Sequence, residues 1–286
     1  KTNNENIMLR LHSIELDKIK RNRAAKVITI VYCSLILGIS LFASYEFNFA
    51  GINFRIADQG IFNFPFIWHF NSFMASWLKI FLAIVIVSIV ANEYSYNTLK
   101  QNLIDGLSKK EFILSKFLAV LLFSVISSVF LFVVSLTLGL VFSDFTEISI
   151  VFTDLQYLLG YFIKLTTFFS MCMFLGIWIK RSAFALGFLG VWQVFEGFIF
   201  IVFSYLKNKK DINLIDNVYN LLPLNAMSDL ISEPFTRLGA VQTLANQVGE
   251  SFEKSYDVPW HSMLICLVWT TVFVYGSYLI LKRRDL

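Results

Sequence analysis

Two ionisable side chains of opposite sign, Lys164 and Glu196, lie inside long apolar stretches of this 286-residue chain. A charge inside a membrane is costly unless an opposite charge or a polar cavity neutralises it. Both residues fall at similar distances from the ends of two apolar stretches that follow each other in the sequence. We therefore expect an ion pair between neighbouring antiparallel helices. The alternatives are that the two side chains line a substrate path, or that they do not meet.

The other residues that could take part in catalysis do not form the pattern of a known kind of active site. The chain has three histidines and three cysteines, and neither set has the spacing of a metal site or of a disulfide framework. The sequence contains no Gly-x-x-x-x-Gly-Lys-Ser/Thr phosphate loop, so it offers no ATP site. Nucleophiles and bases do not converge within the apolar stretches. We expect no catalytic residue, no metal ligand, no bound cofactor and no enzyme activity.

The apolar stretches themselves predict the fold class. Six of them are long enough to cross a bilayer, whose hydrocarbon core of about 30 Å needs about 20 residues of helix. Because a barrel strand would alternate between polar and apolar residues, runs of this length indicate helices. The sequence predicts an all-α integral membrane protein with six transmembrane helices. The predicted spans are 27–45, 73–92, 117–142, 157–179, 183–206 and 260–281.

Composition agrees with a single transmembrane domain over residues 1–286. Hydrophobic residues make up 57% of the chain and charged residues only 15%, a balance too apolar for a soluble domain of this length. The longest connection, 207–259, is too short and too closely tied to its neighbouring spans to form a separate domain. Short amphipathic helices on the outer side of the membrane fit this connection.

The basic residues predict the orientation. Lysines and arginines gather before the first span, between spans two and three, between spans four and five, and after span six, and such clusters are retained in the cytoplasm. The outer connection after span one carries a single basic residue, Arg55. The outer connection after span three carries none. Lys207, Lys209 and Lys210 are exceptions. We expect a multi-pass protein of the cell inner (plasma) membrane with both termini in the cytoplasm.

The N-terminal residues 1–26 form a polar run that ends in a basic cluster. Ile7, Leu11 and Ile14 share one helical stripe, although Leu9 and Leu16 fall nearly opposite. An amphipathic helix lying on the membrane surface, with its cationic end on anionic lipid head groups, fits this pattern. The alternative is a charge cluster that only sets the orientation.

Aromatic residues alternate in the outer connection between spans one and two, at positions 62, 64, 66, 68 and 70. Because aromatic belts favour the membrane interface, we expect this segment to lie on the outer membrane surface. A lateral gate or an apolar substrate rim is the alternative. Lys79, two residues after Trp77, is expected to snorkel outward.

The cytoplasmic connection 93–116 is polar but carries an apolar ridge. Leu99, Leu103, Ile104 and Leu107 recur at three- and four-residue spacing, so a short helix there presents a ridge to a partner below the membrane. Gly106 breaks this helix. Ser108 and Glu111 then have the spacing of a capping box that begins the next helix.

Together with the six-span plan, this connection resembles the permease subunits of type-2 ATP-binding-cassette (ABC) transporters. The positions that carry the resemblance are Glu93, Thr98–Leu99, Leu103, Ser108–Lys109 and Lys116. The sequence departs from the family pattern at two places. Asn97 stands where a Gly commonly precedes Thr-Leu, and Gly106-Leu107 stands where a Pro often precedes the Ser.

The resemblance implies a chain that is moved by a separate cytoplasmic ATPase. Two ATPase subunits would hold ATP and Mg, and a second permease copy or a homologue would complete a dimer. The dimer interface would carry the substrate, and the resemblance implies an exporter. The helix after span two would be the coupling helix, and the coupling residues would be Glu93, Thr98, Leu99, Lys100, Leu103, Ser108 and Lys109. Membrane lipids are expected as partners, and nucleic acid is not. The alternative is an ion- or proton-coupled transporter or channel that uses Lys164 and Glu196.

Overall fold

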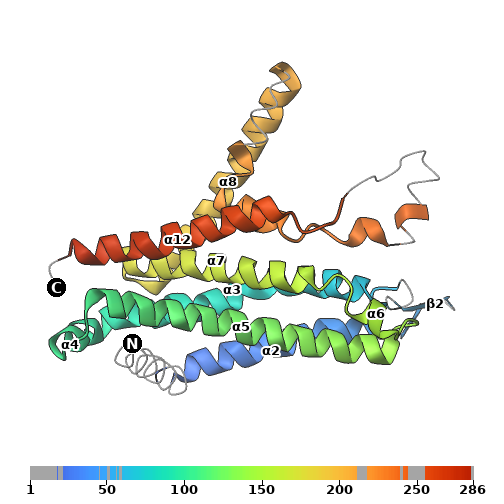
Figure 1. The fold of residues 1–286 in the computed structure, drawn as a ribbon, viewed down its shortest axis with the longest axis horizontal. Coiled ribbons are helices and arrows are strands. Elements are labelled where there is room, and N and C mark those ends of the chain that lie inside the picture. Colours follow the sequence, from blue (N-terminus) through green and yellow to red (C-terminus); the bar gives the residue numbers. More distant parts are fainter. Residues whose placement is uncertain are drawn as a thin grey trace.

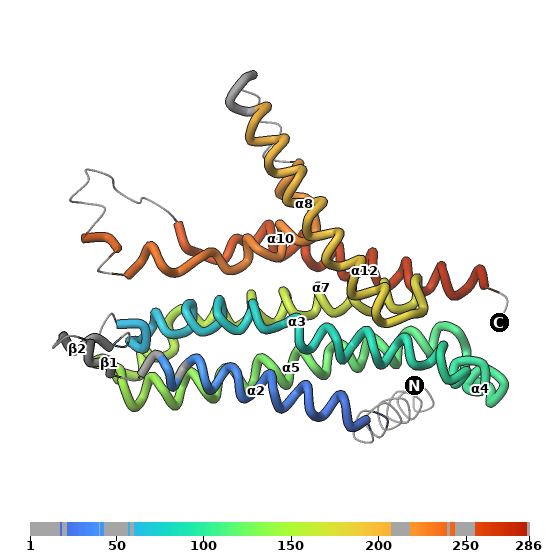
Figure 2. The backbone as a smooth tube through the Cα atoms, turned by 180° about the vertical axis from the view of Figure 1, so that it is seen from behind, coloured from blue at the N-terminus to red at the C-terminus, as the bar shows by residue number. Residues whose placement is uncertain are grey.

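The structure is a computed structural model. It describes residues 18, 22–44, 46–49, 52–55, 57, 60–210, 218–238, 241–243 and 255–284. The bundle consists of helices that lie side by side along the long axis of the molecule: α2 (Arg23–Ser44), α3 (Phe66–Ser95), α5 (Lys109–Phe142), α7 (Gln156–Ile179) and α12 (Trp260–Lys282) (Figure 1). Helix α8 (Ser182–Lys210) leaves this bundle at a steep angle, as the view from behind also shows (Figure 2).

Five helices of the described residues are long and apolar enough to cross a membrane: 66–95, 109–142, 148–179, 182–206 and 260–282. Each coincides with one of the predicted spans, so the prediction of a multi-pass helical membrane protein is confirmed to that extent. The first predicted span, 27–45, coincides with α2, which is a helix but is not one of these five. A sixth crossing stays a prediction.

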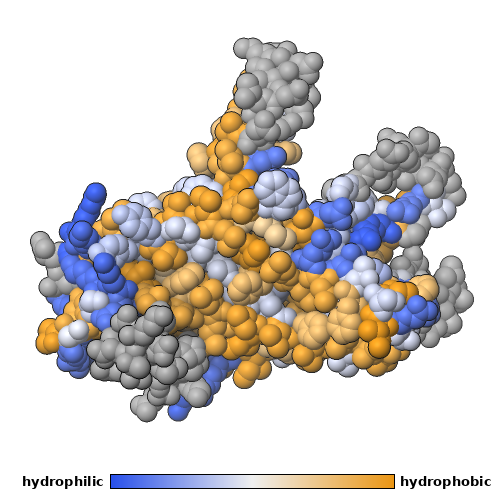
Figure 3. Space-filling model, viewed as in Figure 1, coloured by the Kyte–Doolittle hydropathy of each residue, from blue (hydrophilic) through white to orange (hydrophobic). Residues whose placement is uncertain are grey.

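Surface hydropathy agrees with the helix pattern. Figure 3 shows an apolar band over the middle of the bundle, with hydrophilic residues gathered at the end that carries the chain termini and, at the other side, near the outer connections. Such a band is the surface that a bilayer would cover.

Helix α7 forms the centre of the bundle. In the segment 148–179, 78% of the most apolar stretch of 18 residues is buried inside the protein. Helix α7 packs against α3, α5 and α12. Gly176 permits the close approach of α3, because a Cβ at this position would lie 3.1 Å from Cβ of Val90. Small residues allow helices in membranes to pack closely, so this glycine sets the distance between α3 and α7.

A two-stranded antiparallel sheet interrupts the helical pattern between α2 and α3. Strands β1 (Glu46–Phe49) and β2 (Ile52–Arg55) pair with Glu46 opposite Arg55. This hairpin is a local feature that was not predicted, and the helical fold class holds for the other elements of the described residues. The signal was a short polar and apolar alternation on both sides of Ala50-Gly51, which is typical of a hairpin but is easily missed beside long apolar runs.

The outer aromatic residues pack inward. Phe62, Phe64, Trp68 and Phe70 are all buried in the core, and the Trp68 indole donates a hydrogen bond to the Val151 carbonyl at 2.8 Å. The expectation that this segment lies on the membrane surface is therefore wrong for these side chains. Their ring area is buried against α5 and the short helix α6 (Ile148–Val151), which removes more apolar surface from water than an interfacial position would.

The outer connection 207–259 contains short helices where the structure describes it. Helix α10 (Pro223–Asp229) packs against α12, α7 and α8, and the 3₁₀ turn η2 (Phe235–Arg237) follows. The remainder of the expected amphipathic helices, like most of the N-terminal run 1–26, lies outside the described residues.

Candidate functional site

The carboxylate of Glu93, at the end of α3, is the centre of a buried polar network. One of its oxygens, Oε1, accepts from Nζ of Lys116 at 2.5 Å and from Nζ of Lys18 at 2.9 Å. The other, Oε2, accepts from the hydroxyl of Thr98 at 2.6 Å. Asn102 lies at the limit of hydrogen-bond distance, 3.5 Å. Glu93 is 4% exposed and Lys116 is 1% exposed, so both charges depend on each other for solvation.

This network joins four parts of the chain. Glu93 belongs to α3, Thr98 begins α4 (Thr98–Ile104), Lys116 lies in the second turn of α5, and Lys18 precedes α2. The sequence analysis singled out Glu93 and Thr98 but left Lys116 out of the site and gave Lys18 no contact. No periodicity indicates these pairings, because the residues are far apart in sequence.

Helix α4 turns its leucines inward. Leu99 is 1% exposed, and Leu103 and Leu107 are partly buried against the core. The expectation that the whole leucine ridge faces a partner is therefore wrong. The exposed side of this turn carries Tyr96, Lys100, Gln101, Ile104 and Asp105. Ile104, which is 84% exposed, is the one member of the predicted ridge that faces outward.

The backbone around α4 is fixed at both ends. Asn97 precedes the helix with φ 54°, in the left-handed region that Asn tolerates better than most side chains. Gly106 follows it with φ 97°. Ser108 then accepts from the Glu111 amide at 3.2 Å and donates its own amide to Glu111 Oε2 at 2.8 Å, which confirms the predicted capping box.

Lys109 contacts the C-terminal end of the chain. Its ammonium donates to the carbonyl of Arg284 at 2.8 Å, and the Arg284 guanidinium donates to the carbonyls of Ile177 and Trp178 at 2.7 and 2.9 Å. These are the last carbonyls of α7, which a cation satisfies well. The Glu93 network, Lys109 and both described ends of the chain therefore lie at one end of the bundle.

Lys164 and Glu196 do not form the expected ion pair, although both are buried. The Glu196 carboxylate instead accepts from the Trp192 indole at 2.6 Å and from the amides of Leu224 and Asn225 at 3.2 and 3.0 Å. These amides belong to the first turn of α10, where a helix has unsatisfied donors. Depth along two helices was therefore a poor guide, because the bundle places α10 beside Glu196.

Residues 25–286 match the model of a family described as "Protein of unknown function (DUF2705)". The chain belongs to the DUF2705 family. A local similarity joins it to "Uncharacterized protein YhcI" of Bacillus subtilis (strain 168), with 40% identity over 63 residues. That segment covers 22% of this chain and 20% of the relative, so the chain matches about a fifth of the relative's length. Neither description states an activity.

A second polar network in the DUF2705 chain lies at the opposite end of the bundle. His69 is fully buried, stacks on Tyr157 with ring centroids 4.3 Å apart, and bonds Ser232 and Arg237 through its two nitrogens at 2.9 and 3.1 Å. Nothing in the spacing of the histidines indicated these contacts of His69. The contacts show that it fastens the segment around η2 to α3 and α7.

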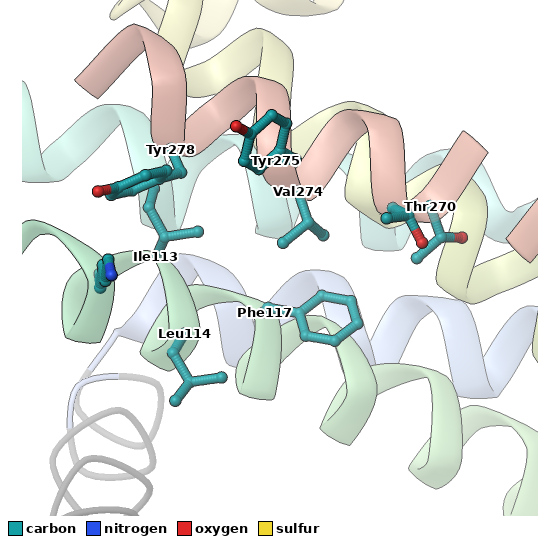
Figure 4. A pocket seen from close by; sticks show the side chains of 9 residues that line it. Ile113, Leu114, Phe117, Thr270, Val274, Tyr275 and Tyr278 are labelled. Carbon is teal, nitrogen blue, oxygen red and sulfur yellow. The ribbon is translucent and has the colours of Figure 1, made fainter. Parts of the chain in front are cut away.

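An apolar groove of about 540 Å³ runs between α5 and α12 on the side of the DUF2705 bundle. Figure 4 shows Ile113, Leu114 and Phe117 of α5 facing Val274, Tyr275 and Tyr278 of α12 across it. Lys110 closes one end, with its ammonium 5.9 Å from the centroid of the Tyr278 ring. Among the described residues, no group of three or more His, Cys, Asp or Glu side chains has a metal-binding arrangement.

Proposed function

We propose that this chain is the membrane-spanning permease subunit of an ATP-driven ABC transporter, and that α4 receives the motion of a separate ATPase. The observation that carries the proposal is the Glu93 network, which ties α4 to α3 and α5 through buried charges. The exposed face of α4, with Lys100 and Ile104, supplies a surface for the partner.

The network gives a physical route for the motion. A force on α4 acts on Thr98, which is hydrogen-bonded to Glu93. It also acts on Leu99, which is buried against the core. Separation of Glu93 from Lys116 would leave two buried charges without partners, which costs about 3–5 kcal/mol. Helices α3 and α5 would therefore move with α4 and not away from it.

The departure at Asn97 supports the resemblance to type-2 ABC permeases. Those proteins commonly carry Gly before Thr-Leu, and the φ of 54° at Asn97 is a conformation that Gly and Asn adopt most readily. Asn97 therefore serves the same backbone requirement as the glycine.

The proposal includes a second permease chain and two ATPase subunits that hold ATP and Mg. The exposure of helix α8 supports a second chain beside it in the membrane. Only 11% of the most apolar stretch of 18 residues in this helix is buried within one chain. The protein would lie in the plasma membrane with α4 and both described chain ends in the cytoplasm. Ion- or proton-coupled transport receives less support, because Glu196 is held by three donors and does not pair with Lys164.

The test is whether the full chain, purified from its own cells, brings a phosphate-loop ATPase with it. The double change Lys100→Glu and Ile104→Glu alters the exposed face of α4 and leaves the Glu93 contacts in place. We expect it to abolish association and the membrane-dependent part of ATP hydrolysis. Arg283→Glu is the matched control, because Arg283 is exposed at the same end of the bundle.

Association that survives the double change would overturn the role of α4. Lys109 is not suitable for this test, although the sequence analysis placed it among the coupling residues. It is bonded to the carbonyl of Arg284, so its reversal would disturb the C-terminal end as well.

A further inference from the structure

A cavity of about 940 Å³ opens between α3, α7, α8, α10 and the start of α12. Lys79 of α3 and Lys164 of α7 both line it. Lys79 was expected to snorkel outward, but its ammonium lies 4.7 Å from the centroid of the Phe168 ring, on the inner side. Two lysines therefore share one cavity at the level of the membrane-spanning helices.

The lysines lack the partners that buried ammonium groups need. Lys164 is 4% exposed. The charges of Lys79 and Asp229 are close enough to interact electrostatically with its ammonium group. Within the described residues, neither Lys79 nor Lys164 has a carboxylate at ion-pair distance, and neither donates a hydrogen bond to a side chain or carbonyl. An ammonium group at this depth is stable when an anionic oxygen reaches it.

Acidic residues line the outer part of the same cavity. Asp229, Glu233 and Asp257 lie on the outer connection, whereas Lys79 and Lys164 lie within spanning helices. With three carboxylates and two ammonium groups ionised, these five residues carry a net charge of −1 (2 − 3). Asp229 and Glu233 already accept hydrogen bonds from Asn225 and Thr236, respectively. A molecule with an anionic group toward the lysines and a cationic group toward Asp257 therefore fits this distribution of charge.

The walls of the cavity also favour an apolar tail. Phe73 and Trp77 of α3 line it, and Trp77 is 72% exposed on the outside of the bundle. Gln193 contributes from α8, the helix that stands away from the bundle (Figure 1). The cavity thus borders a surface that lipid would cover.

We propose that this cavity binds the head group of a zwitterionic amphiphile, with its phosphate or carboxylate between Lys79 and Lys164 and its amine toward Asp257. Charge-assisted hydrogen bonds from the two ammonium groups hold the anionic oxygens. The apolar tail leaves past Trp77 toward the bilayer. The inference goes beyond the proposed function and does not depend on it, since a chain without any ATPase would bind the same ligand.

The test measures binding to the purified full chain in detergent by the rise in its thermal unfolding midpoint. The probes are phosphatidylethanolamine, phosphatidylglycerol and O-phosphoethanolamine. We expect phosphatidylethanolamine to bind more tightly than phosphatidylglycerol, and Lys79→Met and Lys164→Met each to weaken it by about tenfold. Lys110→Met is the control, because Lys110 belongs to the separate groove between α5 and α12.

Misfolding would not mimic this result. Replacement of a buried ammonium group by an apolar side chain of similar length removes a desolvation cost, so both variants should fold at least as well as the wild type. Unchanged phosphatidylethanolamine affinity in both variants would overturn the site, and equal or tighter binding of phosphatidylglycerol would overturn the zwitterion. Equal stabilisation by O-phosphoethanolamine would support the site and assign it to a soluble ligand. The α4 variants should leave all of these values unchanged.

Discussion

At the scale of single residues, the charges that matter most are those that the bundle removes from water. Glu93 and Lys116 are both buried, and Oε1 of Glu93 lies 2.5 Å from Nζ of Lys116. The Glu93 carboxylate also accepts hydrogen bonds from Lys18 and Thr98. Glu196 is buried beside three donors. In each case a single carboxylate satisfies groups from several elements, so its removal affects more than one contact.

The Glu93 pair should behave as a coupled unit. Glu93→Gln leaves the buried Lys116 without a counter-charge, and we expect a loss of about 3 kcal/mol in the free energy of unfolding in detergent. Lys116→Met added to Glu93→Gln should recover most of this loss, which gives a large coupling energy in a double-mutant cycle. Lys100→Met, an exposed change in the same region, should alter stability by less than about 0.5 kcal/mol. Additive effects of the two buried changes would contradict the pairing.

Glu196 should stabilise the first turn of α10. Glu196→Ala leaves the amides of Leu224 and Asn225 and the Trp192 indole without their acceptor, at an expected cost of about 2 kcal/mol. Limited proteolysis should then cut the chain faster near residues 218–238. Val194→Ala, on the same helix and 73% exposed, serves as the control. A cleavage rate equal to that of the wild type would show that α10 does not depend on this carboxylate.

At the scale of elements, α7 organises the bundle because it packs on α3, α5 and α12. Polar contacts add to its apolar packing. The hydroxyls of Tyr32 in α2, Ser127 in α5 and Tyr161 in α7 bond one another, and Thr167 of α7 bonds Thr270 of α12 at 3.0 Å. These bonds between helices are worth about 0.6 kcal/mol each in membranes, so they select orientation more than they supply stability.

The α3 and α7 pair should be sensitive to side-chain volume. Gly176→Leu places a side chain where Val90 already lies 3.1 Å from the Cβ position, and we expect a loss of about 2–3 kcal/mol in stability. Gly187→Leu is the matched control, because no heavy atom lies within 4 Å of a Cβ there. The fraction of folded, monodisperse protein after heating in detergent gives the measurement. Equal losses in both variants would rule out a close contact between α3 and α7.

At the scale of the whole molecule, the two ends of the bundle differ. One end carries α4, Lys18, Arg284 and the capping box, and the other carries the hairpin, α6 and the His69 network. Basic side chains gather at the first end, which the positive-inside tendency assigns to the cytoplasm.

Labelling of single cysteines should separate the ends. Cysteines placed at Gln101 and Arg283 should react with a membrane-impermeant maleimide only from the cytoplasmic side, and one placed at Thr146 only from the outside. All three positions are exposed, and Cys33, the least buried native cysteine, is replaced by Ala beforehand. Reaction of Gln101→Cys and Thr146→Cys from the same side would contradict the arrangement of the spans.

The sequence by itself determined where the long helices lie, although α3 and α5 begin several residues before the predicted spans. Long apolar runs leave a chain in lipid no other way to satisfy its backbone, and local residues such as Ser108 and Glu111 set where a helix begins. Five spans and the capping box were predictable for this reason. The helix after span two was also predictable, because its leucine spacing and Gly106 are local signals.

The tertiary structure alone decided which side chains meet. The position of a residue within a span gives its depth along the helix, but not the identity of the element that its side chain meets. Lys164 and Glu196 therefore looked like a pair and are not one, whereas Lys116 and Lys18 converge on Glu93 across long sequence separations. The inward turn of the α4 leucines and the departure of α8 from the bundle follow from the same cause. Each depends on packing between helices that only the folded chain brings together.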